Sequence, residues 1–233
     1  ALDNIHLVDC QFDNYGFVSA WHDASTIYFD ANNYLISRNY FEGNAGNAGV
    51  GTAIETHGSQ QVVTDNILKN VSTGVNVTGV GTTNDNIIIA NNVMLNVRWG
   101  VKIYSQTSSG STAGLRNTQI TGNMIIQDLD MWFNTGSTPA TLYGSGISVG
   151  GSWDLPVINL LIANNNIRLL PFTSLTQASD NNGNGINLYD PMPYSAQHSG
   201  IKISNNTIDG ALSSGIWVAL DVVDLDISNN SIR

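Results

Sequence analysis

A six-residue pattern recurs along the whole chain. It consists, in order, of an aliphatic residue, two small polar residues, an asparagine, a variable residue and an apolar residue. Residues 203–208 (Ile-Ser-Asn-Asn-Thr-Ile) are a clear copy, and the first copy, at 7–12, carries Cys10 in place of the asparagine. The asparagines of the other copies are Asn39, Asn66, Asn92, Asn123, Asn165, Asn206 and Asn230. A repeat that runs from end to end fixes the architecture before any single residue is interpreted.

A second pattern follows most copies of the first and consists of glycine, an aliphatic residue, a variable residue and another aliphatic residue. It begins at Gly74, Gly100, Gly146, Gly185 and Gly215, with looser versions at Gly16 and Ala53. Each repeat therefore holds two or three short strands of period two, which are too brief to bury a core alone. Such units are stable only when they stack on their neighbours, so we predict a parallel β-helix.

The spacing of the asparagines indicates which kind of β-helix. It varies from 24 residues (Asn206 to Asn230) to 42 residues (Asn123 to Asn165). Left-handed β-helices need a rigid hexapeptide count, whereas the right-handed form tolerates insertions at its turns. We therefore predict an all-β, right-handed parallel β-helix with one coil for each copy of the pattern, about eight in all. Each asparagine is expected to adopt a left-handed backbone at a tight corner and to bond the coils on either side.

Within a coil, we expect the glycine strand, a first turn, the asparagine strand, the tight corner and a short strand, in that order. In the first coil this places the glycine strand at 16–19 and a long turn at 20–33. Because the repeat is continuous, residues 1–233 are expected to form one domain. Both ends lie inside a coil and nothing resembles a capping helix, so we expect a fragment of a longer protein.

Composition narrows the possible partners. The net charge is −10, with only 8 Lys and Arg, which argues against nucleic acid and anionic membranes as partners. No apolar run is long enough to span a membrane, so no membrane insertion is expected. The single cysteine excludes an internal disulfide and a cysteine-ligated metal site, and no cofactor or metal motif is present. The surface must consist largely of Asn, Ser, Thr and Gly, which suits hydrogen bonding to sugars.

The glycine strands predict two rows of outward-facing side chains, because equivalent positions in stacked strands lie roughly 4.8 Å apart. The first row is Val18, Glu55, Asn76, Lys102, Ser148, Asn187 and Trp217. The second is Ala20, His57, Thr78, Tyr104, Gly150, Tyr189 and Ala219. Aromatic rings beside acids and amides are typical of surfaces on which sugars stack. The substrate-binding candidates are Trp21, Asp23, His57, Lys102, Tyr104, Trp153, Tyr189 and Trp217.

Two groups could catalyse cleavage of a sugar chain. Asp154 and Asp190 fall in the same turn of adjacent coils, about 5 Å apart if one rung separates them, which suits a glycosidase pair. The alternative is that both aspartates only form turns. Glu55 and His57, together with Lys102 and Tyr104, could instead abstract the proton next to a uronic carboxylate, as a lyase requires. The alternative there is a surface ion pair of little energetic value.

The two repeat patterns together resemble the right-handed β-helix proteins of the pectate lyase-like superfamily, over essentially the whole chain. Members of that superfamily act on polysaccharides as lyases, hydrolases or epimerases, and bacteriophage tailspikes use the same fold as homotrimers. The signatures of polygalacturonases are missing apart from an echo at His57-Gly58, and that of alginate epimerases is absent. The resemblance is therefore specific for the fold and not for one reaction.

From this resemblance we expect a tailspike-like or secreted polysaccharide depolymerase, either a glycoside hydrolase or a polysaccharide lyase, with Asp154, Asp190 and Glu55 as catalytic candidates. Its partner would be a capsule, an O-antigen or a uronan, and the full-length protein would be a homotrimer outside the cell or on the virion surface. The alternatives are a noncatalytic glycan-binding adhesin, a structural fibre segment, or an active site that lies between subunits.

Overall fold

The protein folds into three parallel sheets that wind around one another. The computed structural model describes residues 3–15, 25–43, 51–80, 84–106, 114–128, 144–151, 156–170, 182–189, 198–211 and 213–233. These residues form strands and turns and contain no helix. Each strand pairs in parallel with the equivalent strands of the neighbouring coils, as in β1–β4 and β4–β7 of the first sheet. The all-β, parallel fold predicted from the repeats is confirmed.

The strands fall into the sheets in strict rotation. Sheet A holds β1 (Asp3–Val8), β4 (Asn32–Ser37), β7 (Gln61–Thr64), β10 (Asn84–Ala90), β13 (Leu115–Thr121), β16 (Val157–Ala163), β19 (His198–Ser204) and β22 (Val222–Ser228). Sheet B holds β2 (Gln11–Tyr15), β5 (Tyr40–Gly43), β8 (Ile67–Lys69), β11 (Val93–Leu95), β14 (Met124–Asp128), β17 (Asn166–Leu170), β20 (Thr207–Asp209) and β23 (Ser231–Ile232). Sheet C holds β3 (Ile27–Asp30), β6 (Thr52–His57), β9 (Thr73–Val80), β12 (Trp99–Gln106), β15 (Gly144–Gly151), β18 (Asn182–Tyr189) and β21 (Ile216–Ala219).

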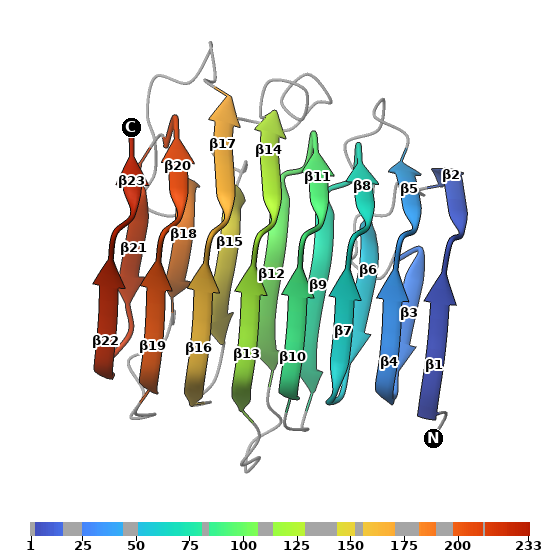
Figure 1. Cartoon of the computed structure of the whole chain (residues 1–233), viewed down its shortest axis with the longest axis horizontal. Coiled ribbons are helices and arrows are strands. Elements are labelled where there is room, and N and C mark those ends of the chain that lie inside the picture. The colour runs from blue at the N-terminus through green and yellow to red at the C-terminus, as the bar shows by residue number, and fades with distance from the viewer. Residues whose placement is uncertain are drawn as a thin grey trace.

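The coil is right-handed. In Figure 1 the chain rises through sheets A and B at the front, descends through sheet C behind them, and moves from right to left with each turn. The asparagine pattern spans the end of a sheet A strand and the start of the sheet B strand that follows. The glycine pattern forms the strands of sheet C. The predicted order of strands within a coil is therefore the observed one.

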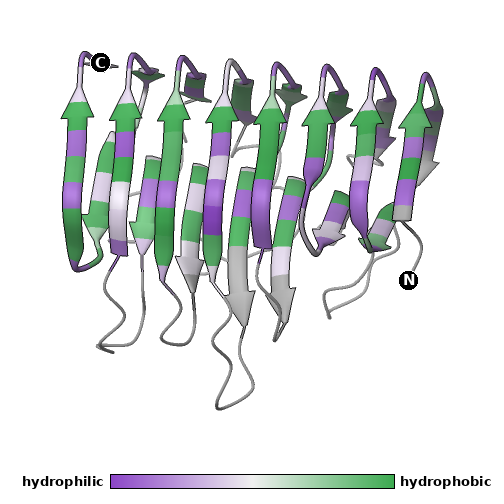
Figure 2. Ribbon diagram, turned by 60° about the horizontal axis from the view of Figure 1, so that its bottom comes forward, coloured by the Kyte–Doolittle hydropathy of each residue, from purple (hydrophilic) through white to green (hydrophobic). Residues whose placement is uncertain are grey.

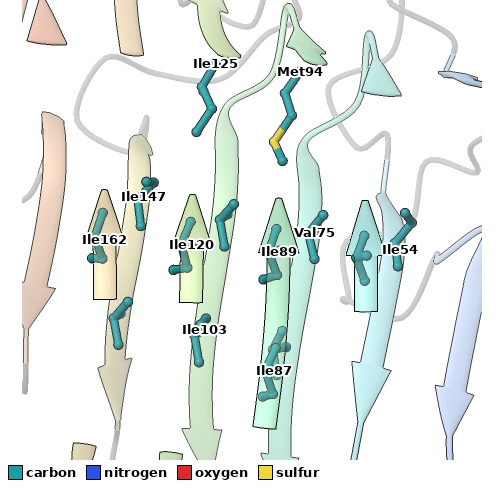
Figure 3. Close-up of a cluster of buried hydrophobic side chains, with 14 of the residues drawn as sticks. Ile54, Val75, Ile87, Ile89, Met94, Ile103, Ile120, Ile125, Ile147 and Ile162 are labelled. Atoms are coloured by element: carbon teal, nitrogen blue, oxygen red, sulfur yellow. The ribbon is translucent and has the colours of Figure 1, made fainter. Parts of the chain in front are cut away.

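The core is a set of stacked aliphatic rows enclosed by the three sheets. The first residue of the asparagine pattern gives one such row in sheet A, in register from strand to strand and fully buried. Its members are Ile36, Val63, Ile89, Ile120, Ile162 and Ile203. Figure 3 shows Ile89, Ile120 and Ile162 filling the interior together with side chains from sheets B and C. Each buried aliphatic side chain contributes about 1.5–3 kcal/mol, so the stacked rows supply the main stabilisation.

A continuous ladder of asparagine amides joins the coils at the tight corner between sheets A and B. Asn92 donates from Nδ2 to Asn123 Oδ1 at 3.0 Å, and Asn123 donates in the same way to Asn165 at 3.0 Å. Each Oδ1 also accepts the backbone N–H of the asparagine one coil earlier, as Asn123 Oδ1 does from Asn92 at 3.0 Å. The corners are hydrophilic in Figure 2, whereas the strands of sheet A alternate between hydrophobic and hydrophilic residues.

One detail of the ladder prediction is wrong. The residue in the left-handed region is the one before each ladder asparagine, for example Arg38 (φ 55°), Asn91 (φ 55°) and Asn205 (φ 57°). The ladder asparagine itself keeps a negative φ because its side chain must point inward to reach the next coil. The left-handed residue makes the corner, and short polar side chains or glycine tolerate that backbone best.

The glycines of the second pattern, which lie within or just before the strands of sheet C, form a second column, and the lack of room for a side chain explains why they are glycines. A Cβ atom added at Gly185 would lie 2.4 Å from Ile208 Cγ2 and 2.6 Å from the carbonyl oxygen of Gly215. Equivalent collisions occur at Gly100 and Gly146, each with an isoleucine of sheet B. The glycine therefore lets sheet C approach the side chains of sheet B at the corner where the coil closes.

We expect Gly185→Ala to lower the free energy of unfolding by about 2 kcal/mol, because the rigid backbone and a packed isoleucine must both give way. Urea unfolding of the two proteins would measure the difference. A loss below about 0.5 kcal/mol, the range of neutral surface changes, would show that the coil can widen at this corner.

The first coil departs from the prediction. On its N-terminal side β6 pairs with β3 at Ile27–Asp30, and β4 begins at Asn32, so the long turn predicted at 20–33 is wrong over 27–30 and 32–33. The predicted glycine strand at 16–19, which includes Val18, lies outside the described residues, as does Ala20. Ile27 and Phe29 pack against the core and Tyr28 and Asp30 face outward, so this strand follows period two without an initial glycine.

Candidate functional site

The outer face of sheet C carries one row of polar, charged and aromatic side chains in register across seven strands. Glu55 pairs with Asn76, Asn76 with Lys102, and Lys102 with Ser148. The row continues through Asn187 to Trp217, and Tyr28 precedes Glu55 at its other end. Its order from Glu55 onward is the predicted one. Five steps of about 4.8 Å place Glu55 and Trp217 about 24 Å apart along this face.

Glu55 is a buried acid on this face. Its residue is 5% exposed, and all six residues of β6 are buried. Ser25 Oγ donates a hydrogen bond to Glu55 Oε2, and His57 Nε2 lies 3.4 Å from Glu55 Oε1. The Tyr28 ring in turn packs on the His57 ring, with centroids 4.8 Å apart. The hydrogen bond from Ser25 therefore orients the carboxylate, and His57, against which Tyr28 packs, lies beside its other oxygen.

The pKa of Glu55 is lowered from its ordinary value of 4.5. Burial alone would raise the pKa, but the close approach of His57, the hydrogen bond from Ser25 and the charges of His57 and Lys102 more than offset it. Glu55 is therefore a carboxylate at neutral pH. An ionised, oriented carboxylate can accept a proton, attack a carbon centre or stabilise a developing positive charge, whereas it is unsuited to donate a proton.

This lowered pKa predicts a pH-dependent contribution to stability. Because the folded-state pKa lies below the unfolded-state value, the stabilisation is complete above about pH 5 and is lost as the pH falls through the folded pKa. We expect Glu55→Gln to be less stable than the parent protein at pH 7, and the difference to shrink below pH 4.5. Urea unfolding of both proteins at pH 7 and pH 3.5 would test this, and a difference that grew on acidification would contradict it.

Strand β3 brings residues to this cluster that were not predicted from the sequence. Besides Tyr28, it places Asp30 opposite His57 on the adjacent strand, exposed and on the same face as Glu55, and Ser25 lies two residues before the strand. Diagonal neighbours of this kind are close enough on a sheet for long side chains to interact. The period-two pattern Ile-Tyr-Phe-Asp was the available signal, but it has no initial glycine.

Lys102 occupies the centre of the face. Its Nζ lies 5.5 Å from the centroid of the Trp99 ring, a cation–π distance. Burial lowers the Lys102 pKa and the nearby charge of Arg98 lowers it further, while Glu55 acts in the opposite direction. Lys102 thus presents a positive charge that is partly withdrawn from water, two strands away from Glu55.

The far end of the face is aromatic. Tyr189 and Trp217 stack with ring centroids 5.3 Å apart and an interplanar angle of 23°. Both side chains are partly exposed, and Tyr189 belongs to the second outward row, in register with Gly150 and Ala219. A stacked pair of this kind offers a flat, rigid apolar surface edged by a hydroxyl and an indole N–H.

Comparison with solved structures supports the fold at the level of the whole chain. A mutant of the tailspike protein of E. coli bacteriophage HK620 superposes with a TM-score of 0.68 over 98% of this chain, at 16% sequence identity. Another mutant of that tailspike, in complex with pentasaccharide, superposes with a TM-score of 0.67 at 17% identity. The chain has the β-helix fold of a phage tailspike. It spans 37% of the length of these tailspike chains.

Sequence comparison adds nothing to this likeness, since no family model and no curated protein matches the chain. Identities of 16–17% to the tailspikes show a shared fold alone. The roles of individual residues on this tailspike-like β-helix must therefore be argued from their own geometry.

Several predicted site residues of this tailspike-like β-helix lie outside the described residues. They are Trp21, Asp23, Trp153, Asp154 and Asp190. The backbone of Tyr104 is described and pairs with Thr78 and Gly150. The structure thus brings Glu55, His57 and Lys102 to one face with Tyr189 and Trp217.

Within the described ranges, no group of three or more His, Cys, Asp or Glu residues is placed to hold a metal ion. The same part of the chain contains no helix that is long and apolar enough to cross a bilayer.

Proposed function

We propose that this chain binds a polysaccharide along the outer face of sheet C and cleaves it near Glu55. The observation that carries the proposal is the combination of a buried, oriented carboxylate and a partly exposed aromatic stack on one face, about 24 Å apart. That length suits an extended sugar chain of several units. The chain would lie across the strands, parallel to the axis of the β-helix.

Binding is supported by the chemistry of the face. Tyr189 and Trp217 suit stacking against the apolar faces of sugar rings, and the amides and hydroxyl of the central rungs suit hydrogen bonding to sugar hydroxyls. The tailspike with the same fold is known in complex with a pentasaccharide, which makes an oligosaccharide a reasonable ligand for this chain too. By the same analogy we propose a location on a virion surface and a homotrimeric full-length protein.

Cleavage is supported by Glu55. In a lyase, the Glu55–His57 pair would accept the proton next to a uronic carboxylate while Lys102 neutralised that carboxylate. In a hydrolase, ionised Glu55 would act as base or nucleophile and a second acid would protonate the leaving oxygen. Asp30 is the described candidate for the second acid, and Asp154 and Asp190 remain candidates outside the described residues.

A noncatalytic glycan-binding adhesin is the second candidate. It is favoured by one observation: Glu55 already receives a hydrogen bond from Ser25 and lies against His57, so its charge is satisfied within the protein. A carboxylate held in this way could simply orient the face for binding.

Mass spectrometry of sugar products tests the proposal. The protein would be incubated with bacterial capsules, lipopolysaccharide O-chains, and plant or algal uronans. Products that carry an added water would identify a hydrolase, and unsaturated products would identify a lyase. Intact polymer with binding that Trp217→Ala weakens would contradict cleavage and support an adhesin. No binding to any polysaccharide would overturn the proposal as a whole.

A further inference from the structure

Ser25 lies two residues before β3, and the pairing of sheet C fixes its place. The next residue, Thr26, donates its backbone N–H to the carbonyl oxygen of Thr52 at 3.0 Å, and β3 then pairs with β6 from its first residue onward. Thr52 begins β6, the strand that carries Glu55. The position of Ser25 relative to Glu55 is therefore set by strand pairing.

The Ser25 side chain interacts directly with Glu55. Its Oγ donates a hydrogen bond to Glu55 Oε2, whereas His57 lies beside the other carboxylate oxygen. A hydroxyl that donates to a carboxylate forms a charge-assisted hydrogen bond, which is roughly twice as strong as one between neutral groups. Ser25 therefore favours the charged form of Glu55 over the neutral form and fixes the direction in which the carboxylate points.

This hydrogen bond matters because Glu55 is buried. Burial is the largest single influence on the pKa of Glu55 and raises it, whereas His57 and then Ser25 lower it. Without the Ser25 hydroxyl, the balance would move towards the neutral acid. A neutral carboxylic acid cannot act as the base or nucleophile that cleavage near Glu55 requires.

The other titratable groups that face Glu55, among the described residues, come from three strands of sheet C. They are Tyr28 and Asp30 on β3, His57 on β6 and Lys102 on β12. Strand β9, which lies between β6 and β12, contributes Asn76 and Thr78 to this face, and neither of them titrates. Ser25→Ala would remove one hydrogen-bond donor from Glu55 and leave all of these titratable groups in place.

We propose that Ser25 is a positioning residue for cleavage, whose hydroxyl holds the Glu55 carboxylate charged and in one orientation without contacting the glycan. This inference rests on the proposed cleavage near Glu55 and adds the residue that prepares the carboxylate for it. Loss of the hydroxyl should lower kcat, because a misplaced or protonated carboxylate reacts slowly. It should leave KM nearly unchanged, because the contacts with the glycan remain.

The glutamate content of the chain allows the charge of Glu55 to be measured directly. The chain contains only two glutamates, Glu42 and Glu55, so ¹³C labelling of the glutamate side-chain carboxyl gives two NMR signals, which Glu55→Gln assigns. We expect Ser25→Ala to raise the pKa of Glu55, because the lost hydrogen bond favoured the charged form. Glu42 is the internal reference, since its hydrogen bonds come from Tyr40 and Lys69 on sheet B and it should titrate as in the parent protein.

Cleavage rates test the positioning role. On a polysaccharide that the parent protein cleaves, Ser25→Ala should reduce kcat by roughly tenfold to a hundredfold and change KM by less than about twofold. The acid limb of the pH profile of kcat/KM should move to higher pH, because this limb follows the ionisation of the base in the free enzyme. Ser25→Thr keeps a hydroxyl and should restore most of the rate. Ser199→Ala is the matched control, because Ser199 is also half-buried but lies on sheet A. Thermal unfolding shows whether each variant is folded.

The outcomes separate this inference from the proposed function. An unchanged titration of Glu55 in Ser25→Ala would overturn the inference, and so would a raised pKa with unchanged cleavage. A higher KM with unchanged kcat would show that Ser25 contacts the glycan and would also overturn the positioning role. In these three cases, cleavage by the parent protein and its loss in Glu55→Gln would leave the proposed function intact. Cleavage of no polysaccharide, or full cleavage by Glu55→Gln, would overturn the proposed role of Glu55 and this inference with it.

Discussion

Glu55→Gln is expected to reduce glycan cleavage by about a hundredfold or more, the usual loss when a general base or nucleophile is removed. The substitution keeps the size of the side chain and one acceptor oxygen, but it removes the negative charge that His57 and Lys102 stabilise. The rate would be measured from the appearance of reducing ends or of unsaturated products. Binding should change by much less, because the aromatic stack lies at the other end of the face.

Glu42→Gln is the matched control. Glu42 also has a lowered pKa, from the hydrogen bonds that Tyr40 and then Lys69 donate to it, but it lies on sheet B. It should leave cleavage unchanged. If Glu55→Gln cleaves as fast as the parent protein, the reaction does not use this carboxylate, and Asp154→Asn and Asp190→Asn become the variants to examine.

The repeats made the fold predictable because every coil of a β-helix has the same structural requirements, which appear in the sequence as short local patterns. The aliphatic position of the asparagine pattern occupies, in the coils between the two ends, the buried row of Ile89 and Ile120, and the glycine of the second pattern occupies the column where a Cβ does not fit. Both requirements act on neighbouring coils in the same way, so they recur in the sequence. The order of the outward row from Glu55 to Trp217 followed directly from this register.

The prediction failed where the local pattern was absent. β3 has no initial glycine, so the strand at Ile27–Asp30 was assigned to a turn, and Val18 and Ala20 took the places that belong to Tyr28 and Asp30. The environment of Glu55 could not be predicted from the sequence either, because it depends on Ser25, which lies 30 residues away in sequence. Outward positions have no periodic requirement, and their environment is set by segments that differ from coil to coil.

Asn123→Ala is expected to lower the free energy of unfolding by about 3 kcal/mol, a large loss for one polar side chain. Asn123 is 1% exposed and sits in the middle of the ladder. Its Nδ2 donates to Asn165 Oδ1 and to the carbonyl of Ile89, both at 3.0 Å, and its Oδ1 accepts the backbone N–H of Asn92. Alanine would leave that N–H and the Ile89 carbonyl unsatisfied in a buried corner and would open a cavity beside them.

The contrast with a neighbouring exposed asparagine isolates this cost. Asn166 begins β17 with an exposed side chain, so Asn166→Ala should change stability by less than about 0.5 kcal/mol. Urea unfolding of the three proteins measures both effects. Since each rung bonds the next, the damage should spread along the ladder, and Asn92→Ala combined with Asn123→Ala should cost less than the sum of the two single changes. If the loss of unfolding free energy in the double variant equalled the sum of the two single losses, each asparagine would stabilise its own corner independently of the others.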